Sequence, residues 1–595
     1  MLSYATPATY RVPGSGNLTD DVLTAERDRP GHVTFSRRTD HGWADVTAAD
    51  FAAEVRGVAR GLLAAGIGPG DRVGLLCRTR YEWTLVDYAI WWVGAVTVPI
   101  YESSSADQVA WVLSDSGAVG CVVEDDAHRA RVEGVRGDLP ALEHLWVVDD
   151  GAVDALVSSG SGVDDAELES RRSGTTPDAL ATVIYTSGTT GRPKGCRLTH
   201  ANLMFEAGSV SDGLADLVDP DDAATLLFLP LAHVFARVIQ VVAVRTGTRL
   251  GHTADVSDLV GALGEFKPSF ILAVPRVFEK VYNGASQKAQ AEGRGRIFDA
   301  ATDTAIAYSR ALDTGSVPLV LRVRHRLFDR LVYGKLRAAL GGRATHAIAG
   351  GAPLGERLAH FFRGIGVPVL EGYGLTETTA AVTVNLPHET KIGTVGRPVP
   401  GTEARVGEDG ELLFRGDQVF SGYWQADDAT AEVLDADGWF HTGDLGEIDG
   451  EGFVRVTGRK KEIIVTAGGK NIAPAVLEDR MRAHAVVSQC MVVGDGKPFV
   501  AALVTLDAEA VAAWADSHGR TGDLAQLAAD PDVLALVQAA VDDANSQVSR
   551  AESVRKFHVL AQDWTEEAGY VTPTLKLKRQ VVLRDFVDDI EALYL

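Results

Sequence analysis

The sequence feature that most restricts the fold is a cluster of glycine, serine and threonine residues placed directly after an apolar run. The apolar run covers Leu180–Ile184, and the cluster that follows, from Tyr185 to Gly195, reads YTSGTTGRPKG. Glycines let backbone N–H groups approach phosphate oxygens, hydroxyls add further donors, and a lysine adds positive charge. The pattern predicts a phosphate-binding loop made by Thr186, Ser187, Gly188, Thr189, Thr190, Gly191 and Lys194.

The spacing of this loop differs from that of the P-loop of kinases and ATPases. Gly191 is followed by Arg192 and Pro193, whereas a P-loop requires lysine and then serine or threonine after its last glycine. A P-loop enzyme is therefore disfavoured. A flexible surface turn is also disfavoured, because such a turn needs neither so many hydroxyls nor so many glycines.

Length and charge restrict the function further. The chain has 595 residues, so two or more domains are expected. Its net charge of −24 should repel phosphates over most of the surface, which argues against a role in nucleic-acid binding. The 4 cysteines are widely separated and lack metal-ligand spacing, which fits a reducing compartment. With no secretory signal in residues 1–20 and no apolar run long enough for a bilayer, we expect a soluble cytoplasmic enzyme.

The order of helical and strand-like patterns predicts an α/β fold. A helical segment at 48–65 precedes a strand at 72–76 and an apolar run at 95–100, and strand-like runs recur at 225–229, 270–274 and 345–349. Each of the later runs ends in a polar or glycine-containing loop, where open α/β sheets bind ligands. Residues 149–177, rich in Ser, Gly and Asp, are predicted to be a surface excursion. Beyond Gly401 short strands and turns predominate, and the domain boundary is placed near Lys461.

The glycine-rich string resembles the phosphate loop of the adenylate-forming superfamily, which contains acyl-CoA synthetases, luciferases and peptide-synthetase adenylation domains. The other motifs of the superfamily occur in the expected order between about Trp43 and Arg579. Residues 274–283 and 458–471 resemble actinobacterial long-chain fatty-acid–CoA ligases. The resemblance implies a large N-terminal domain (1–460) of α/β subdomains with a small β-barrel-like part, and a small, mobile C-terminal α+β domain (461–595).

The implied reaction has two steps and uses ATP, Mg²⁺ and coenzyme A. A long-chain fatty acid and ATP give an acyl-adenylate and pyrophosphate, and CoA then takes the acyl group and releases AMP. The enzyme must bring two anions together and neutralise the charge that grows on the α-phosphate. No covalent nucleophile on the protein is required.

The resemblance assigns the nucleotide to three motifs. In Gly372–Glu377 it implies that Tyr373 stacks on adenine, Thr376 contacts the α-phosphate and Glu377 binds Mg²⁺, a metal that prefers carboxylate oxygens. In His441–Asp444 it implies that Asp444 holds the ribose hydroxyls. The adenine would be lined by Gly350, Gly351, Ala352 and Pro353, with Gly372 and Gly374 next to the stacking tyrosine.

Further residues are assigned to the domain that moves. The resemblance implies that Arg459 contacts the ribose, that Lys461 is the hinge, and that Lys576 is the adenylation lysine. Leu575 stands where many members have glycine, so Lys578 remains an alternative. Gly468 and Gly469 would contact the pantetheine arm of CoA after the rotation.

The acyl group is assigned to Pro230–Arg237, where His233 would lie near the carboxylate. No aspartate occurs between Leu226 and Ile239, which argues for an uncharged tail. The short spacing between Asp444 and Gly468 leaves no room for the insertion typical of acyl-AMP ligases, so CoA is favoured as acceptor. The alternatives are an acyl-AMP ligase or an activator of a shorter or aromatic acid. A non-catalytic sensor is disfavoured because Glu377 and the C-terminal lysines are retained.

Residues 322–343 show a basic amphipathic helical pattern, in which arginines alternate with apolar residues. Two interpretations are open. A surface helix with a solvated basic face is the favoured one, and weak peripheral contact with anionic lipid is the other.

Overall fold

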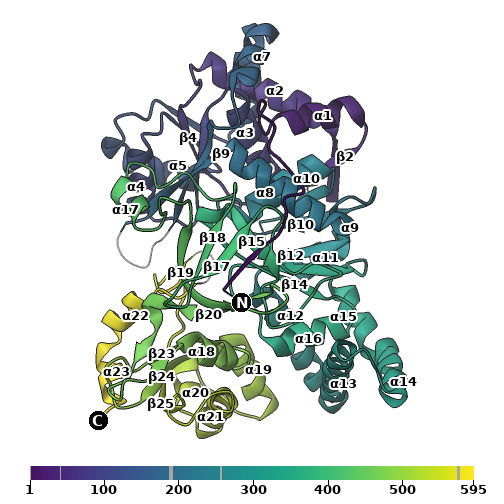
Figure 1. The fold of residues 1–595 in the computed structure, drawn as a ribbon, viewed down its shortest axis with the longest axis vertical. Helices are drawn as coiled ribbons and strands as arrows, with labels where there is room; N and C mark the ends of the chain where they lie inside the picture. Colours follow the sequence, from purple (N-terminus) through teal and green to yellow (C-terminus); the bar gives the residue numbers. More distant parts are fainter. Residues whose placement is uncertain (1, 40–41, 187–191, 255–257, 573–575) are drawn as a thin grey trace.

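The computed structural model describes residues 2–39, 42–186, 192–254, 258–572 and 576–595. The most extensive hydrophobic core of the large body reaches from Leu18 to Phe440, and two smaller clusters lie in the same body. Two separate clusters, one of them from Ile464 to Val559, lie in a smaller C-terminal unit at the lower left of Figure 1. None of these clusters combines buried residues of both parts, which explains the division of the fold into a large part and a small part.

The first sheet of the large body carries the predicted phosphate loop at one end. Its neighbouring strands are, in order, β7 (His144–Val147), β6 (Gly120–Val123), β4 (Arg72–Leu76), β5 (Val96–Ile100), β8 (Leu180–Thr186) and β9 (Lys194–Thr199). All pairs from β7 to β8 are parallel, and β9 runs antiparallel to β8. Strands β5 and β6 are buried throughout, as apolar runs in a parallel sheet covered on both faces should be.

Two more sheets complete the α/β part. One contains β10 (Ala224–Leu227), β11 (Arg249–His252), β2 (Val33–Thr39) and β3 (Gly42–Thr47). The other contains β12 (Phe270–Ala273), β13 (His346–Ala349), β14 (Val369–Leu375), β15 (Ala380–Val384) and β16 (Arg397–Pro398). Because β12, β13 and β14 are parallel, the segments that follow Ala273, Ala349 and Leu375 leave the sheet at the same edge.

An antiparallel sheet joins the α/β body to the C-terminal unit. It contains β1 (Ser3–Ala5), β17 (Glu403–Val406), β18 (Glu411–Arg415), β19 (Phe440–Ile448) and β20 (Val454–Arg459). The N-terminal strand β1 therefore pairs with residues about 400 positions away. This sheet is the small β part that the resemblance implies.

The C-terminal unit is an α+β domain, as expected. Its sheet is β23 (Val487–Val493), β24 (Val500–Leu506) and β25 (Val554–Val559), and a hairpin of β21 (Ile464–Val465) and β22 (Asn471–Ile472) precedes it. Helices α18 (Pro474–Arg482), α19 (Ala508–Ser517), α21 (Pro531–Asn545) and α22 (Arg579–Asp585) pack around this sheet (Figure 1). The fold class predicted from the sequence is confirmed.

The surface excursion predicted for residues 149–177 is instead largely helical. It folds into α6 (Ala152–Ser159) and α7 (Asp165–Gly174), and Asp164 caps α7 by accepting a hydrogen bond from Ala166 N–H at 3.0 Å. Helix α6 packs closely on α2 (Ala48–Ala64), where a Cβ on Gly61 would lie 2.2 Å from the Leu156 carbonyl oxygen. The polar residues of this segment lie at helix caps and on exposed faces. Each helix nevertheless buries one leucine, Leu156 in α6 and Leu168 in α7.

Among the described residues, no helix is both long and apolar enough to cross a membrane.

Candidate active site

The base of the predicted phosphate loop is formed by the β8–β9 hairpin. Thr186, the last residue of β8, pairs with Lys194, the first residue of β9. The loop residues Ser187, Gly188, Thr189, Thr190 and Gly191 lie outside the described residues. The returning arm is anchored by Trp111, whose Nε1–H donates to the Pro193 carbonyl oxygen at 2.9 Å. The Arg192 guanidinium also lies over the Trp111 ring, 4.6 Å from its centroid.

Thr376 and Glu377 lie in a short 3₁₀ turn, Thr376–Thr378, directly after β14. The chain then passes through Thr379 (φ 52°) and Ala380 (φ 85°), a backbone region that non-glycine residues rarely occupy. Gly374 makes this turn possible, because a Cβ there would lie 1.4 Å from the Ala380 carbonyl oxygen. Strain of this kind is typical of binding and catalytic segments.

Two partners from distant segments hold the strained turn. The Thr379 hydroxyl donates to the Gln418 carbonyl oxygen at 2.7 Å, and the Ala381 N–H donates to Glu206 Oε1 at 2.9 Å. Glu206 is fully buried on α8 (His200–Gly213), and this burial raises its pKa well above the usual range. Glu206 therefore supports the turn from inside the core, as the acceptor of the Ala381 N–H.

Tyr423 connects Glu377 to the phosphate-loop lysine. Its hydroxyl donates to Glu377 Oε1 at 2.8 Å, and Lys194 Nζ lies 5.1 Å from the centre of its ring. Burial, together with the nearby Glu377 carboxylate, raises the pKa of Tyr423, so the phenol stays protonated and remains a donor. The structure thus brings Lys194 and Glu377 to the same place through a residue that the sequence did not single out.

Tyr373, Asp444 and Arg459 form a second cluster. The Tyr373 hydroxyl donates to Asp444 Oδ2 at 2.5 Å, and Arg459 Nε donates to Asp444 Oδ1 at 2.8 Å. Asp444 and Arg459 face each other as paired residues of β19 and β20, which fixes their separation. The Asp444 N–H donates to the Thr442 hydroxyl at 3.0 Å. The carboxylate, only 4 % exposed, is therefore held from both sides.

Lys576 comes to this cluster from the C-terminal domain. The residue is exposed to solvent, and partial desolvation of its ammonium group is the main reason that the pKa of Lys576 is lowered. Arg459 lowers the pKa further, while Asp444 and Glu377 act in the opposite direction. All three groups are thus close enough to act on Lys576. Neither Lys576 nor Lys578 makes a side-chain ion pair within the described part of the chain, so the preference for Lys576 rests on the charged groups that act on it.

His233 lies close enough to Lys576 for the lysine charge to act on its imidazole. It caps helix α10 (Val234–Thr246), where its Nδ1 accepts the Phe235 N–H at 3.2 Å. Desolvation, and second the charge of Lys576, lower the pKa of His233 to about 3. The imidazole is therefore neutral, with Nδ1 as the acceptor.

Helix α10 is fixed by a buried ion pair one turn beyond His233. Arg237 Nε donates to Asp87 Oδ2 at 3.0 Å, and neither side chain is exposed. The same guanidinium donates to the Thr182 hydroxyl at 2.6 Å, on the strand that leads into the phosphate loop. The helix of His233 and the strand of the phosphate loop are thereby joined through one arginine.

The predicted adenine-lining residues Gly350, Gly351, Ala352 and Pro353 follow β13. A Cβ on Gly350 would lie 3.8 Å from the Gly372 carbonyl oxygen, so this segment runs close to the start of the tyrosine motif. Directly after it, the Leu354 N–H donates to Glu371 Oε2 at 3.0 Å. Burial raises the pKa of Glu371 to about 8. Glu371 was not singled out by sequence, although it precedes Gly372.

Three predicted residues are not brought to these clusters. Gly468 and Gly469 lie in an exposed turn between β21 and β22, where the Gly469 N–H donates to the Thr466 carbonyl oxygen at 2.8 Å. Lys461 is exposed in the short turn Lys460–Glu462 and makes no ion pair within the described ranges. Their predicted roles, in CoA binding for the two glycines and as the hinge for Lys461, stay predictions.

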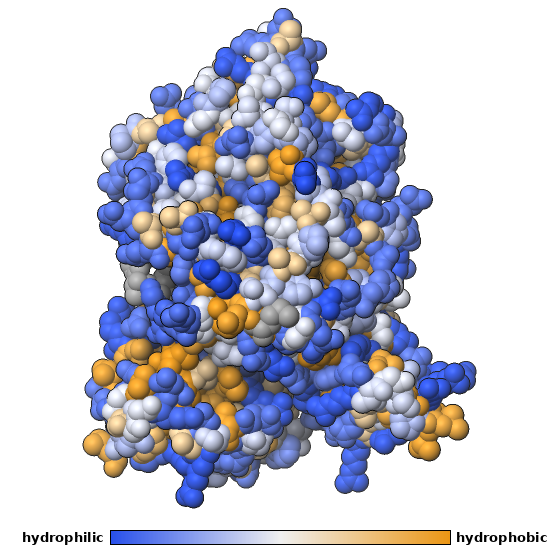
Figure 2. Space-filling model, viewed as in Figure 1, coloured by the Kyte–Doolittle hydropathy of each residue, from blue (hydrophilic) through white to orange (hydrophobic). Residues whose placement is uncertain are grey.

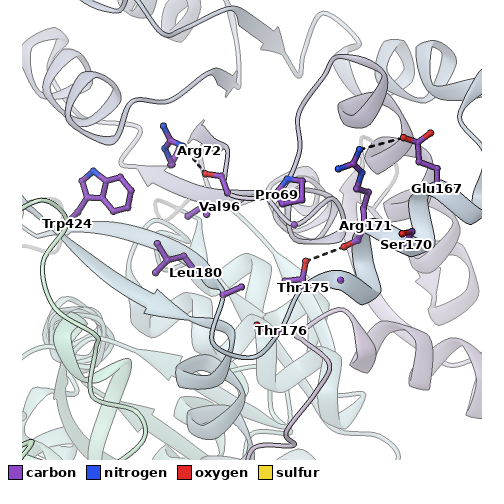
Figure 3. Close-up of a pocket in the computed structure, with 14 residues that line it drawn as sticks. Pro69, Arg72, Val96, Glu167, Ser170, Arg171, Thr175, Thr176, Leu180 and Trp424 are labelled. Atoms are coloured by element: carbon purple, nitrogen blue, oxygen red, sulfur yellow. Dashed lines mark hydrogen bonds and ion pairs between the residues drawn. The ribbon is translucent and has the colours of Figure 1, made fainter.

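A cavity of about 600 Å³ lies elsewhere in the large body (Figure 3). It opens at the amino ends of β4, β5 and β8, whereas the phosphate loop leaves the carboxyl end of β8. The guanidinium of Arg72 at its wall already donates to the carbonyl oxygens of Gly70, Ser116 and Gly117. This cavity includes none of the predicted site residues.

A large α/β body and a small α+β domain that supplies a lysine to clustered carboxylates are the features of an adenylate-forming enzyme. The family described as AMP-binding enzyme matches residues 23–424, and the family described as AMP-binding enzyme C-terminal domain matches residues 461–595. The chain belongs to the AMP-binding enzyme family, as the sequence motifs predicted.

Similar proteins agree with this assignment. The chain is 51% identical to a long-chain-fatty-acid–CoA ligase, FadD15, of Mycobacterium bovis and 50% identical to that of Mycobacterium tuberculosis, each over 599 residues and the full length of both chains. Among solved structures, the A-PCP didomain of carboxylic acid reductase from Segniliparus rugosus, in complex with AMP, is similar with a TM-score of 0.75 at 20% identity. That likeness covers 99% of this chain and 84% of the other, and it shows a shared fold.

Proposed function

We propose that this protein is a long-chain fatty acid–CoA ligase that works through an acyl-adenylate. The observation that carries the proposal is the convergence of Lys576 from the small domain with Glu377, Asp444 and Arg459 from the large one. A reaction between two anions needs positive charge and fixed hydrogen-bond partners at the point where they meet. This cluster supplies both.

In the first step, the fatty acid carboxylate attacks the α-phosphorus of ATP, and pyrophosphate leaves with the electrons of the broken P–O bond. Lys576 would contact both anions and offset the charge that grows between them. Asp444 would accept hydrogen bonds from the ribose hydroxyls, and its fixed position between Tyr373 and Arg459 suits that task. Thr376 and Lys194 would contact the phosphates from the strained turn and the loop.

Glu377 is the residue proposed to hold Mg²⁺. One of its oxygens is occupied by the Tyr423 hydroxyl, and a carboxylate oxygen has further lone pairs for a hard cation. The metal would add positive charge beside the pyrophosphate. A second acidic group, Glu124, Asp125 and Asp149, fits less well, because Arg78 already occupies Glu124 at 2.6 Å.

In the second step, the thiol of CoA attacks the acyl carbonyl carbon and AMP leaves. We propose that the small domain first rotates about Lys461, which would bring Gly468 and Gly469 to the acyl-adenylate. The present position of Lys576 beside Asp444 corresponds to the first step. The exposed glycine turn, apart from the site, supports the need for a rotation.

The proposed acid is long and uncharged along its tail. Relatives of full length are named long-chain-fatty-acid–CoA ligases, and no aspartate that could bind a substrate amine occurs between Leu226 and Ile239. The neutral His233 at the start of α10 would lie near the carboxylate, where it adds no competing charge.

The test is pyrophosphate and AMP release with fatty acids of graded length, with and without CoA. The proposal expects AMP release that depends on CoA and rises with chain length. Pyrophosphate release with retained acyl-adenylate, indifferent to CoA, would instead identify an acyl-AMP ligase. A preference for short or aromatic acids would identify the other alternative.

A further inference from the structure

Helix α14 (Leu319–Phe328) is an outlying element of the large domain. It continues through a π-helical turn, Asp329–Tyr333, into α15 (Gly334–Ala339), and it lies beside α13 (Gly295–Asp313) at the lower right of Figure 1. One face fastens it to the body. Phe328 is buried, His325 Nε2 lies 2.7 Å from the Gly364 carbonyl oxygen, and the His325 ring stacks on Tyr308 at 3.9 Å.

The other face of α14 exposes a row of large apolar side chains. At 3.6 residues per turn these positions share one side of a helix. Figure 2 shows apolar residues gathered at this corner of the molecule. Single exposed apolar residues need no explanation, whereas a contiguous exposed row indicates a contact surface. The exposed residues are Leu319 (75 %), Val320 (79 %), Val323 (61 %), Leu327 (57 %) and Leu331 (52 %).

Arginines flank this apolar row. Arg322, Arg326 and Arg330 recur at intervals of four and so follow one edge of it. They are exposed, and none of them makes an ion pair within the described part of the chain. Arg324 lies at the other edge, where it donates to the Ala300 carbonyl oxygen at 3.4 Å and lies 5.8 Å from the centre of the Phe328 ring. The one acid in the segment, Asp329, is already paired with Arg337 at 2.7 Å.

This charge is unusual for the chain. The protein carries a net charge of −24, so a helix with four available arginines and an occupied acid is a local exception. An anionic surface would repel most of the protein and attract this corner. Guanidinium groups bind phosphates well, while the apolar row needs a surface that also accepts hydrocarbon.

We propose that α14 docks this enzyme on the surface of an anionic lipid bilayer. The apolar row, Leu319 to Leu331, would enter the boundary between headgroups and acyl chains, and the flanking arginines would bind lipid phosphates, as interfacial amphipathic helices do. Long-chain acids partition into bilayers, so docking would bring the enzyme to its substrate, and this benefit rests on the proposed function. The docking of α14 on lipid does not depend on the proposed function.

The same observations disfavour two other occupants. A second copy placed face to face on α14 would bring two rows of unpaired arginines together, and like charges in an interface oppose association. A nucleic acid would use the arginines but leave the apolar row in water. An anionic lipid bilayer would contact both the arginines and the apolar row.

The experiment is flotation of the full-length protein with vesicles. Neutral phosphatidylcholine vesicles are compared with vesicles in which about a third of the lipid is phosphatidylglycerol, at low and high salt. The proposal expects partition onto the anionic vesicles only, weakened by salt. Absence of the wild-type protein from floated anionic vesicles would overturn it.

Two triple variants separate the contributions of charge and apolar contact. Arg322→Ala/Arg326→Ala/Arg330→Ala should lower the vesicle partition coefficient about a hundredfold, from about fivefold per arginine. Leu319→Ser/Val323→Ser/Leu327→Ser should lower it more than about tenfold. All six positions are exposed, so folding should be unaffected. Partition equal to that of the wild type in both variants would refute the assignment to α14.

Matched controls carry the same changes elsewhere on the surface. Arg27→Ala/Arg129→Ala/Arg520→Ala changes the net charge equally, and Val260→Ser/Val476→Ser/Val587→Ser removes three exposed valines. Both should partition within about twofold of the wild type, because they leave the α14 charges in place. A comparable loss in these controls would contradict a localised docking site.

Two further measurements separate lipid docking from dimerisation and from the ligase reaction. Sedimentation equilibrium is run on the wild type and the serine triple variant. Dimerisation that the serine changes abolish would assign the face to a second copy and overturn lipid docking. Ligase activity with a short, water-soluble acid is measured for every variant and should not change. If the protein floats but lacks ligase activity, the proposed function fails and the docking stands.

Discussion

The two halves of the candidate site are built in different ways. The large domain holds its residues in advance, since Asp444 is fixed between Tyr373 and Arg459, and Glu377 is fixed by Tyr423. In the small domain, Lys576 is tied to Thr572 by two hydrogen bonds, from the Thr572 N–H to the Lys576 carbonyl oxygen at 2.8 Å and from the Lys576 N–H to the Thr572 hydroxyl at 3.0 Å. One half is preorganised, and the other is delivered.

Charged side chains meet where the two halves touch. Arg276 on α12 (Pro275–Ala291) pairs with Asp507, the N-cap of α19, at 3.0 Å. At another point Glu566 faces Glu102, whose pKa is raised by burial and also by that like charge. A partly exposed ion pair and a repulsive contact between the halves suit the proposed movement of the small domain. This difference teaches that mutations of the preorganised residues of the large domain should affect both half-reactions. Mutations of the residues that the small domain supplies should affect one half-reaction more than the other.

The largest expected effect is that of Lys576→Ala. Loss of this charge should lower adenylate formation, measured as pyrophosphate release, by about a thousandfold, which is the scale for removing one electrostatic stabiliser of a transition state. Thioester formation from supplied acyl-adenylate should change less than about threefold, because the delivered half has moved away by then. Lys578→Ala is the matched control and should leave both half-reactions nearly intact. An equal loss of both half-reactions in Lys576→Ala would contradict the view that the small domain supplies Lys576 for adenylation alone.

Much of the preorganised half could be predicted from sequence. The strand predicted at 72–76 is β4, and the apolar runs at 180–184 and 345–349 lie in β8 and β13. Buried parallel strands are continuous apolar runs bounded by glycine-containing loops, so a single sequence reveals them. The family motifs then place Tyr373 in the last part of β14 and Glu377 in the turn after it, whereas Asp444 lies within β19 of the antiparallel sheet. Local pattern and site coincide in these cases.

What the sequence could not predict are the partners that hold these residues. Tyr423 is 46 positions from Glu377, and Glu206 is 175 positions from Ala381. Neither has a local signal, because a buried glutamate in a helix and a tyrosine in a loop are ordinary until the chain folds. The helices at 152–174 escape prediction for a related reason, since their hydroxyl-rich composition resembles that of a loop. Long-range contacts, rather than propensities, decide all three.

Asp444→Ala should break the preorganised half and so impair both half-reactions. The acyl-adenylate keeps its ribose through both steps, and removal of a charged hydrogen-bond partner costs about 1.5–3 kcal/mol. We expect about a hundredfold weaker binding of ATP in adenylation, and a similar loss for supplied acyl-adenylate in thioester formation. Titration of each ligand checks this. Asp435→Ala, a nearby loop acid, is the control. Impairment of adenylation alone would contradict a shared binding role.

Glu371→Gln should sharpen the comparison through pH. Burial raises the pKa of Glu371 to about 8, against about 4.3 when unfolded, so the folded state keeps a proton that the unfolded chain releases. The stabilisation is complete below about pH 4 and is lost as pH rises towards 8, at a slope of at most about 1.4 kcal/mol per pH unit.

The glutamine variant keeps an acceptor for the Leu354 N–H and has no proton to lose. Chemical denaturation of the large domain between pH 5 and 8 should therefore show a flatter profile for Glu371→Gln than for the wild type. Glu408→Gln, at an exposed position, should keep the wild-type slope. Identical slopes for wild type and Glu371→Gln would mean that this carboxyl group ionises freely when folded.

The smallest expected effect concerns the contact between the halves. Arg276→Ala removes an ion pair that is about one-fifth exposed on the arginine side and one-quarter on the aspartate side, so it should cost about 0.2–1 kcal/mol. Because the pair exists in the arrangement that presents Lys576, adenylation should slow by about two- to threefold, while thioester formation stays equal or becomes faster.

Asp507→Asn is the best change to combine with Arg276→Ala in a double-mutant cycle. Asp507 also caps α19 by accepting the Ala510 N–H at 3.0 Å, and asparagine preserves that cap while removing the charge. The two changes should be less than additive, since each breaks the same pair. High salt should reproduce their effect in the wild type. Additive losses that also slow thioester formation would show that Arg276 supports the large domain itself, through Glu279 at 3.1 Å, rather than the position of the delivered half.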